Sequence, residues 1–396
     1  MKPEIASLPA PGAAARPIAH RFAGLCMAIA LIIAQPRAAR AESSLSYEYA
    51  DYQEMGSRIS VDTESALAEQ DLGTDMQFKL GGVIDTIAGA TPTGQPAPAG
   101  SDQVPLANDT DLRRAWNADL SRQFSAINLD VGFARSIEDD YTSNGWSVNT
   151  LTNFNQNNTT FLLGAAGTDD NVEVFFKPAW LRKLANDGII GVTQLIDPLT
   201  SVSVNATWTR QIGFLSDPYK LVEVNEQILP GIVLPETFNE NRPNARNKGN
   251  VLASVNRALP GAGAAIEASY RFYHDTWGIT ANTLELFWFQ NAGKHLIFRP
   301  NVRLYEQSAA QFYSYNLLNS GLVPTHNPEG PFFSSDARLS AFDSADFGMK
   351  TIWKINYRFQ FDVALEGYRQ RGTDGVTPQS AYYSARIITC GSKLSW

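Results

Sequence analysis

The sequence contains few of the residues that carry metal, redox or nucleophilic chemistry. Its 396 residues include two cysteines, Cys26 and Cys390, and four histidines. Cys26 lies in the N-terminal leader described below, so Cys390 has no partner for an intrachain disulfide. The histidines beyond the leader, His274, His295 and His326, are too far apart in the sequence to suggest a metal site. We therefore expect neither a metal nor another cofactor.

Long apolar runs are also missing. No run of about eighteen apolar residues follows the N-terminal region, so no transmembrane helix is expected. The apolar run over 22–34 is shorter, follows a mildly basic stretch and precedes Ala-Arg-Ala at 39–41, which has small residues where a signal peptidase reads. We predict a secretory signal peptide over 1–41 and one mature domain over 42–396. Leu25 is too large for the usual lipobox, which argues against a lipoprotein.

Basic residues are outnumbered by acidic ones. Removing the signal peptide takes away five basic residues and one acidic residue, which leaves 27 basic and 39 acidic residues and a net charge of −12. A nucleic-acid partner would require a basic face, so we exclude nucleic acid as a partner.

Regular alternation is what the sequence does contain, most clearly over 265–305. Three successive runs of about ten residues place aromatic and aliphatic side chains on one face and polar or charged ones on the other. The apolar set is Ile266, Ala268, Tyr270, Phe272, Leu284, Leu286, Trp288, Leu296, Phe298, Val302 and Leu304. Strands with lipid on one face and water on the other have this pattern.

The alternation continues along the chain, and we predict about sixteen strands. Short turns on one rim and long loops on the other are typical of bacterial outer-membrane barrels. A soluble sandwich or propeller would explain neither this asymmetry nor the terminal aromatic residue, Trp396. We therefore predict an all-β fold, an antiparallel transmembrane β-barrel with short periplasmic turns and long extracellular loops, in a Gram-negative outer membrane. The predicted short connections are 70–72, 124, 155–157, 197–199, 259–262, 290–293 and 353–356, and the long ones are 89–109, 170–183, 213–245, 307–336 and 371–380.

Several stretches resemble a bacterial outer-membrane β-barrel family catalogued only as a domain of unknown function. They are IAGATPTG (87–94), LSDPYKLV (215–222), NRPNAR (241–246), YRFYHDTWGI (270–279), LEL (284–286), RPNVRLYEQSAAQFY (299–313), SSDARLSAF (334–342) and EGYRQR (366–371). The resemblance covers most of the mature chain and implies a porin-like barrel with no assigned reaction. Family members tend to be encoded beside a flavin-attaching transferase, a thioredoxin-like protein and a small lipoprotein. This implies periplasmic redox proteins or that lipoprotein as partners. The ending CGSKLSW (390–396) is less regular than the family's usual final strand.

Charged residues on the predicted inward faces of the strands are candidates for lining a water-filled lumen. Such residues bias which solutes pass through a pore, and a sixteen-strand barrel can hold an aqueous channel. The same residues would alternatively form ion pairs that hold the wall, and loops 213–245 and 307–336 are long enough to plug the lumen. The candidates are Glu267, Arg271, Glu285, Arg299, Arg303, Arg338, Arg358, Asp362 and Glu366.

A second group of candidates lies in the predicted loops. The sequence Ser-Asp-Pro-Tyr at 216–219 is typical of a turn in which Asp217 accepts backbone N–H groups. Pairing between loops and binding of a ligand are both compatible with this composition. The loop candidates are Asp217, Tyr219, Lys220, Arg242, Arg246 and Asp336.

Catalysis would need a base beside a nucleophile, and the sequence offers no convincing pair. His274 and Asp275 are adjacent, but neighbouring strand residues point to opposite faces, so the two cannot serve one site unless the strand ends between them. We therefore expect no enzyme, and an outer-membrane hydrolase is the least favoured alternative. The expected function is passage of small polar solutes, and the main alternative is a sealed barrel that docks periplasmic or surface redox proteins. Outer-membrane lipid and the barrel assembly machinery are the other expected partners.

Overall fold

The computed structural model describes residues 43–396 except 175–176, 231 and 324–329. The predicted signal peptide and His326 lie outside the described residues. Within the described part of the chain, no helix is long and apolar enough to cross a membrane.

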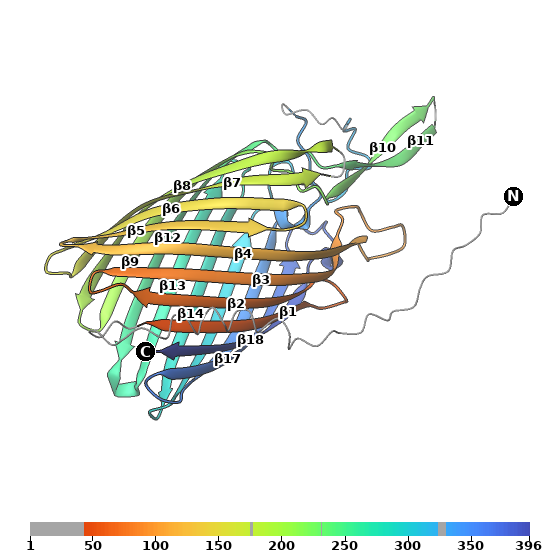
Figure 1. Cartoon of the computed structure of the whole chain (residues 1–396). Coiled ribbons are helices and arrows are strands. Elements are labelled where there is room, and N and C mark those ends of the chain that lie inside the picture. The colour runs from red at the N-terminus through yellow and green to blue at the C-terminus, as the bar shows by residue number, and fades with distance from the viewer. Residues whose placement is uncertain (1–42, 175–176, 231, 324–329) are drawn as a thin grey trace, which may run out of the picture. The chain divides into compact units, whose positions relative to one another are not determined.

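Sixteen strands form a closed antiparallel barrel, as predicted, and two further strands form a separate hairpin (Figure 1). The barrel strands follow one another in chain order, and β1 closes the barrel by pairing with both β2 and β18. The barrel strands are β1 (Ser44–Glu54), β2 (Ser60–Asp71), β3 (Met76–Pro92), β4 (Leu106–Phe124), β5 (Ile127–Ile137), β6 (Tyr141–Phe154), β7 (Thr159–Val174), β8 (Lys177–Asp197), β9 (Thr200–Gly213), β12 (Ala245–Leu259), β13 (Ala264–Asp275), β14 (Thr280–Ala292), β15 (Leu296–Gln307), β16 (Phe342–Lys354), β17 (Phe359–Gly372) and β18 (Ser384–Ser395).

The hairpin consists of β10 (Leu221–Leu229) and β11 (Ile232–Asn239) and is inserted between β9 and β12. In Figure 1 it extends beyond the barrel strands, at the end opposite to the C-terminus. Among the described residues, three single-turn 3-10 helices lie in other connections: η2 (Pro260–Ala262), η3 (Ala337–Leu339) and η4 (Gln379–Ala381).

The outer face of the barrel carries the large apolar side chains. On β5, Ile127, Val131 and Phe133 are all more than 40% exposed, and the alternating residues Asn128, Asp130 and Gly132 point to the lumen. Leu284 and Leu286 take the same outward position on β14. A soluble protein would bury such residues, whereas a membrane barrel places them against lipid.

The two rims differ in the length of their connections. At the end that carries the C-terminus, every connection between consecutive strands spans four residues or fewer, from 72–75 to 355–358. At the other end the connections include 93–105, 214–244, 308–341 and 373–383. This difference identifies the long-loop end as the extracellular end.

Several predicted strand boundaries were wrong. β3 and β4 extend to Pro92 and from Leu106, into the segment 89–109 that was expected to be a loop. The predicted connection 170–183 is also mostly strand, because β7 extends to Val174 and β8 begins at Lys177. Here β7 and β8 carry polar residues on the outer face as well, such as the ion pair between Arg182 and Asp169 at 2.6 Å, so the alternation disappears although the strands continue.

The lumen wall contains a repeated pair of an inward glycine and an inward asparagine or aspartate on the neighbouring strand. In each pair the two residues are register partners, and the amide or carboxylate oxygen lies closer than 3 Å to the place of the missing Cβ. The polar side chain therefore occupies the space above the glycine. The pairs are Gly81–Asn117, Gly132–Asp119, Gly164–Asn149, Gly191–Asn205, Gly348–Asn301 and Gly391–Asp362.

Candidate functional site

The loop 214–244 crosses the extracellular mouth of the barrel. It leaves the barrel at β9 and returns at β12, yet it contacts the end of β3, and five barrel strands lie between β9 and β3. The backbone N–H of Leu221 donates to the carbonyl oxygen of Thr93 at 2.7 Å. The Lys220 ammonium donates to the carbonyl oxygen of Pro92 at 2.5 Å and to Thr91 Oγ1 at 3.1 Å. The loop thus spans the opening instead of following the rim.

The loop 308–341 crosses the same mouth from another side. The Tyr315 hydroxyl accepts the backbone N–H of Ala97, in the connection between β3 and β4, at 2.8 Å. Tyr313 and Thr377 share a hydrogen bond of 2.6 Å between their hydroxyl groups, which links this loop to the connection between β17 and β18. We call the loops 214–244 and 308–341 together the cap.

The cap has its own small apolar core. Val222, Val224, Leu317 and Phe333 form one buried cluster, which joins hairpin β10–β11 to the loop 308–341. Trp277, Ile279, Ala310 and Leu339 form a second cluster beside the connection between β13 and β14. Apolar burial of this kind stabilises a folded arrangement of the two loops.

A network of buried charges joins the two loops of the cap. Arg242 lies 2.8 Å from Asp336, and its Nε lies 2.6 Å from Glu240 Oε1, so it forms ion pairs with both carboxylates. Glu240 also accepts the Ser334 hydroxyl and the backbone N–H of Asp217, each at 2.5 Å. The side chains of Glu240, Asp336 and Arg242 are at most 10% exposed.

Arg338 and Asp217 extend the network toward solvent. Arg338 pairs with Asp336 at 2.5 Å and with Asp217. The Asp217 carboxylate also accepts the backbone N–H of Tyr219 at 2.9 Å, so the predicted Asp217 turn is confirmed. Asp336 accepts the backbone N–H of Arg338 at 3.0 Å and so starts η3. Arg338 is therefore a cap residue, and its predicted place on an inward strand face was wrong.

Burial and neighbouring charges shift the pKa values of the cap residues in opposite directions. Burial, together with the nearby carboxylates of Asp336 and Asp217, raises the pKa of Glu240 to about 7, although Arg242 opposes the shift. Burial also acts on Asp336, but the guanidinium groups of Arg338 and Arg242 outweigh it and hold the pKa of Asp336 below its usual range. Burial lowers the pKa of Lys220.

The remaining loop candidates lie around the cap. Arg246 pairs with the buried Asp275 and stacks over the ring of Trp277, with 4.1 Å between the guanidinium carbon and the ring centre. Asp275 in turn accepts the backbone N–H groups of Trp277 and Ile279, at 2.9 and 3.1 Å. Tyr219 donates its hydroxyl to Asp140 in the connection between β5 and β6. All six loop candidates therefore take part in contacts between connections or between a connection and a strand end.

A cavity of about 200 Å³ lies beneath the cap. It is lined by residues from five connections and from the ends of β1, β3 and β17, including Arg58, Gln95, Lys220, Tyr315 and Arg338. Arg58 is buried and donates to the carbonyl oxygen of Tyr382 at 2.8 Å. A small polar solute crossing the mouth would meet these groups.

Seven of the nine lumen candidates point into the barrel, because each alternates with an outward apolar residue. Arg303 lies 3.2 Å from Glu285, and Lys350 lies 2.7 Å from Asp362. Part of the set therefore forms ion pairs between neighbouring strands on the lumen face. Arg299 stacks over Phe287, with 5.3 Å between the guanidinium carbon and the ring centre. The seven are Glu267, Arg271, Glu285, Arg299, Arg303, Asp362 and Glu366. Their effect on solutes stays a prediction.

Arg358 is the second lumen candidate that was misplaced. It lies in the short turn 355–358, where its guanidinium carbon is 5.1 Å from the ring centre of Tyr357. Asn356 accepts the backbone N–H groups of Arg358 and Phe359, at 2.8 and 2.9 Å, and this turn delays the start of β17.

His274 and Asp275 point to opposite faces of β13, as the alternation predicted. His274 is exposed and lies 3.2 Å from Thr280 Oγ1, whereas Asp275 is buried against Arg246. The geometry thus separates this histidine from the neighbouring carboxylate.

One group of carboxylates in the described part of the chain has the spacing of a metal site. Oxygens of Asp111, Glu138 and Asp140 lie within 4.8 Å of one another. Arg113 lies 3.6 Å from Glu138, and Tyr219 donates to Asp140, so protein groups already meet two of the three carboxylates.

Sequence comparison identifies the family. A family model described as a protein of unknown function, DUF3570, matches residues 23–187 and 179–384. The chain belongs to the DUF3570 family. This confirms the resemblance given above. No curated protein sequence matches the chain.

Solved structures similar to this DUF3570 protein are outer-membrane barrels. CdiB from Acinetobacter baumannii is 7% identical, with a TM-score of 0.50 over 91% of this chain and 61% of CdiB. A bacterial polysaccharide outer membrane secretin is also 7% identical, with a TM-score of 0.49 over 89% of this chain and 98% of the secretin. The likeness to CdiB concerns the fold alone. The closed barrel with its apolar outer wall points to the bacterial outer membrane.

Several of the stretches that resemble the DUF3570 family meet at the cap. Residues 87–94 end where Lys220 and Leu221 of 215–222 make contact, and 241–246 supplies Arg242 and Arg246. The stretch 334–342 supplies Asp336 and its network. Sequence reasoning missed Glu240 and Trp277, which lie beside recognised residues but gain their meaning only from contacts between loops.

Proposed function

We propose that this protein lets small polar solutes cross the outer membrane and that the cap restricts the passage. One observation carries the proposal: charged side chains inside the barrel remain accessible to water. The side chain of Glu48 is 49% exposed and that of Arg303 is 47% exposed, although both point to the lumen. A barrel filled by packed side chains would bury them.

The cap supports a restricted pathway instead of a wide pore. Its two loops cross the mouth, and the contacts between them combine ion pairs, hydrogen bonds and two small apolar clusters. The cap is thus a folded unit that can loosen as a whole, because its links to the β3 end are hydrogen bonds such as Leu221–Thr93.

The proposal is tested by planar-bilayer recordings of the refolded protein. We expect rare, small conductance steps for the wild type and larger or more frequent steps for a variant in which residues 221–239 are replaced by a short glycine-serine linker. Arg303→Glu should shift the ion selectivity toward cations, because it inverts a lumen charge. Arg358→Glu, in the short turn, is the matched control and should leave selectivity nearly unchanged. Absence of steps in both the wild type and the linker variant would refute solute passage.

A docking role is the second candidate, and the hairpin β10–β11 is the observation that favours it. Leu229, Ile232 and Leu234 near its tip are about half exposed, at 57%, 48% and 52%. A partner protein on the cell surface, such as a surface redox protein, would bury them. A photo-crosslinker at position 234, compared with one at the lipid-facing position 286, tests this in cells. A protein adduct specific to position 234 supports docking, and identical products at both positions contradict it.

A further inference from the structure

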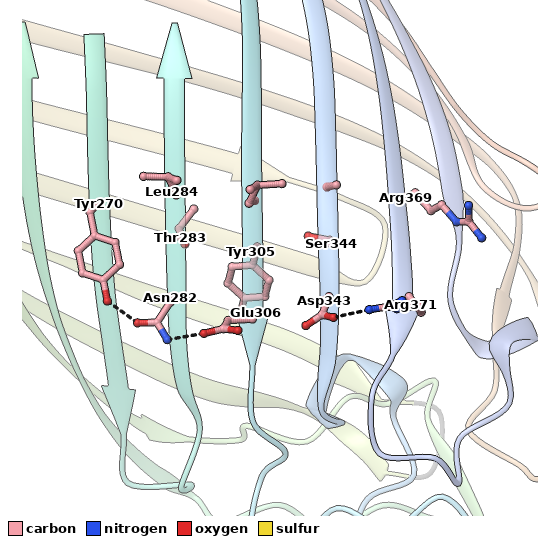
Figure 2. A pocket seen from close by; sticks show the side chains of 12 residues that line it. Tyr270, Asn282, Thr283, Leu284, Tyr305, Glu306, Asp343, Ser344, Arg369 and Arg371 are labelled. Carbon is pink, nitrogen blue, oxygen red and sulfur yellow. Dashed lines mark hydrogen bonds and ion pairs between the residues drawn. The ribbon is translucent and has the colours of Figure 1, made fainter.

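A groove of about 590 Å³ lies on the outer wall of the barrel, across strands β13 to β17 (Figure 2). Its floor includes the outward side chains of Leu284 and Leu304 and the small side chain of Ala345. Leu304 and Ala345 are register partners, and Ala345 leaves the hollow that a larger residue would fill. The groove therefore opens toward the membrane and not toward the lumen.

The groove is polar only at its extracellular end. Along the outer face of β17, Phe361 and Leu365 come first, and Arg369 and Arg371 follow at the extracellular end. Asp343 lies beside Arg371, with 3.0 Å between carboxylate and guanidinium, and Figure 2 shows this pair at the same level as Glu306. An apolar floor followed by a charged rim matches the order of acyl chain and headgroup in a membrane lipid.

Arg369 is a charged residue of the groove whose side chain has no protein partner in the described part of the chain. Its side chain is exposed, and no hydrogen bond or ion pair joins that side chain to another residue among those that the structure describes. Arg371 is held by Asp343. At the other end of the rim, Glu306 accepts a hydrogen bond from Asn282 at 2.8 Å. The charge along the rim thus changes from negative at β15 to positive at β17. An anion is therefore attracted to the β17 end of the rim.

We propose that this groove binds an outer-leaflet lipid through a phosphate of its headgroup. Arg369 contacts the phosphate, since guanidinium groups bind phosphate by two parallel hydrogen bonds and basic residues attract anionic lipids. Leu284, Leu304 and Ala345 contact the first carbons of an acyl chain. Because the groove lies at the long-loop end, the lipid belongs to the outer leaflet.

Native mass spectrometry of the whole protein in detergent, with bisphosphorylated lipid A added, tests the site. We expect a lipid adduct whose amount falls about tenfold or more in Arg369→Gln, as loss of a charge-assisted hydrogen bond predicts. Arg369→Lys keeps the charge and should retain most of the adduct. Arg135→Gln is the matched control: Arg135 is also an outward arginine toward the extracellular end, 3.4 Å from Asn144 Oδ1 and outside the groove.

Two further arms separate lipid from phosphate alone. Lipid A without its phosphates should bind no better to the wild type than to Arg369→Gln. Inorganic phosphate at the same concentration should not displace lipid A, because it cannot use the apolar floor. Equal adduct formation by wild type and Arg369→Gln would overturn the proposal, and so would displacement by inorganic phosphate. Resistance of each variant to unfolding in cold SDS shows that the barrel is intact.

Discussion

Leu221 donates its backbone N–H to the carbonyl oxygen of Thr93 at 2.7 Å, although the strands that lead to the two residues are separated by five others in the barrel. This hydrogen bond links the loop that follows β9 to the end of β3, on the other side of the barrel mouth. Together with the bond from Lys220 to Pro92, it shows that a loop of a membrane barrel can close on the opposite wall. The properties of the mouth therefore depend on contacts between loops as much as on the lumen wall.

Gly94 provides a direct test of the contact between the loop 214–244 and the end of β3. It has φ +98°, and a Cβ there would lie 2.6 Å from the Leu221 carbonyl oxygen. We expect Gly94→Ala to push the loop 214–244 away from β3 and to raise solute uptake into proteoliposomes.

Gly100→Ala is the matched control for Gly94→Ala. Gly100 lies in the same connection with φ +83°, but nothing lies within 4 Å of its Cβ position. Both variants carry a similar backbone strain of about 1 kcal/mol, so only Gly94→Ala should change uptake. Equal uptake by the two variants would show that the contact does not hold the cap closed.

Arg242 tests the buried charge network. Its replacement by Met leaves Glu240 and Asp336 buried without this partner, and such a change costs about 3–5 kcal/mol. We expect faster hydrogen exchange over 214–244 and 308–341, with unchanged exchange in the barrel strands. Arg182→Met, which removes the exposed pair with Asp169, should change exchange little. Unchanged exchange in the Arg242 variant would show that the apolar clusters, and not the charge network, stabilise the cap.

The barrel wall could be predicted because its pattern is local. A strand places successive side chains on opposite faces, so Tyr270 and Leu284 could be assigned to the lipid side and Glu285 to the lumen from their spacing alone. Arg358 could not be assigned correctly, since the Asn356 turn breaks the strand while the sequence still alternates. The pattern thus predicts faces better than it predicts strand ends.

The cap could not be predicted in the same way. Lys220 and Pro92 are 128 residues apart, and neither shows its partner in the sequence. The loop candidates were identified as charged residues among turn formers, and their contacts were left undecided between pairing and ligand binding. The structure supplies the pairing, because Arg242, Asp336 and Arg338 come together only when both long loops fold over the mouth.

Glu240 makes the cap sensitive to pH. Its pKa in the folded cap is raised from the ordinary 4.5 to about 7, so the closed cap holds a proton that an open cap releases. Glu240 therefore makes its full contribution to the stability of the closed cap below its ordinary pKa. That contribution is lost as the pH rises through about 7. Asp336 has a lowered pKa, so its own contribution is present above its ordinary pKa and does not change between about pH 5 and 8.

We expect hydrogen exchange over 334–342, corrected for intrinsic rates, to accelerate from pH 6 to 8. Glu240→Gln imitates the protonated carboxyl group and should remove this acceleration while it keeps the contact with the Asp217 N–H. Acceleration of the same size in Glu240→Gln would mean that another group controls the pH response.

Val204 and Asn205 test the assignment of the two faces at adjacent positions. Val204 is 42% exposed on the outer wall, whereas Asn205 points to the lumen and covers Gly191. An arginine on the lipid face costs about 2–4 kcal/mol near the bilayer midplane. We therefore expect Val204→Arg to lower the yield of folded protein in lipid vesicles, measured by the heat-dependent shift in SDS gels. Leu286→Arg should behave like Val204→Arg. Asn205→Arg should fold nearly as well as the wild type, because its charge reaches a water-accessible lumen. The opposite order of yields would show that the lipid face and the lumen face of β9 are assigned the wrong way round.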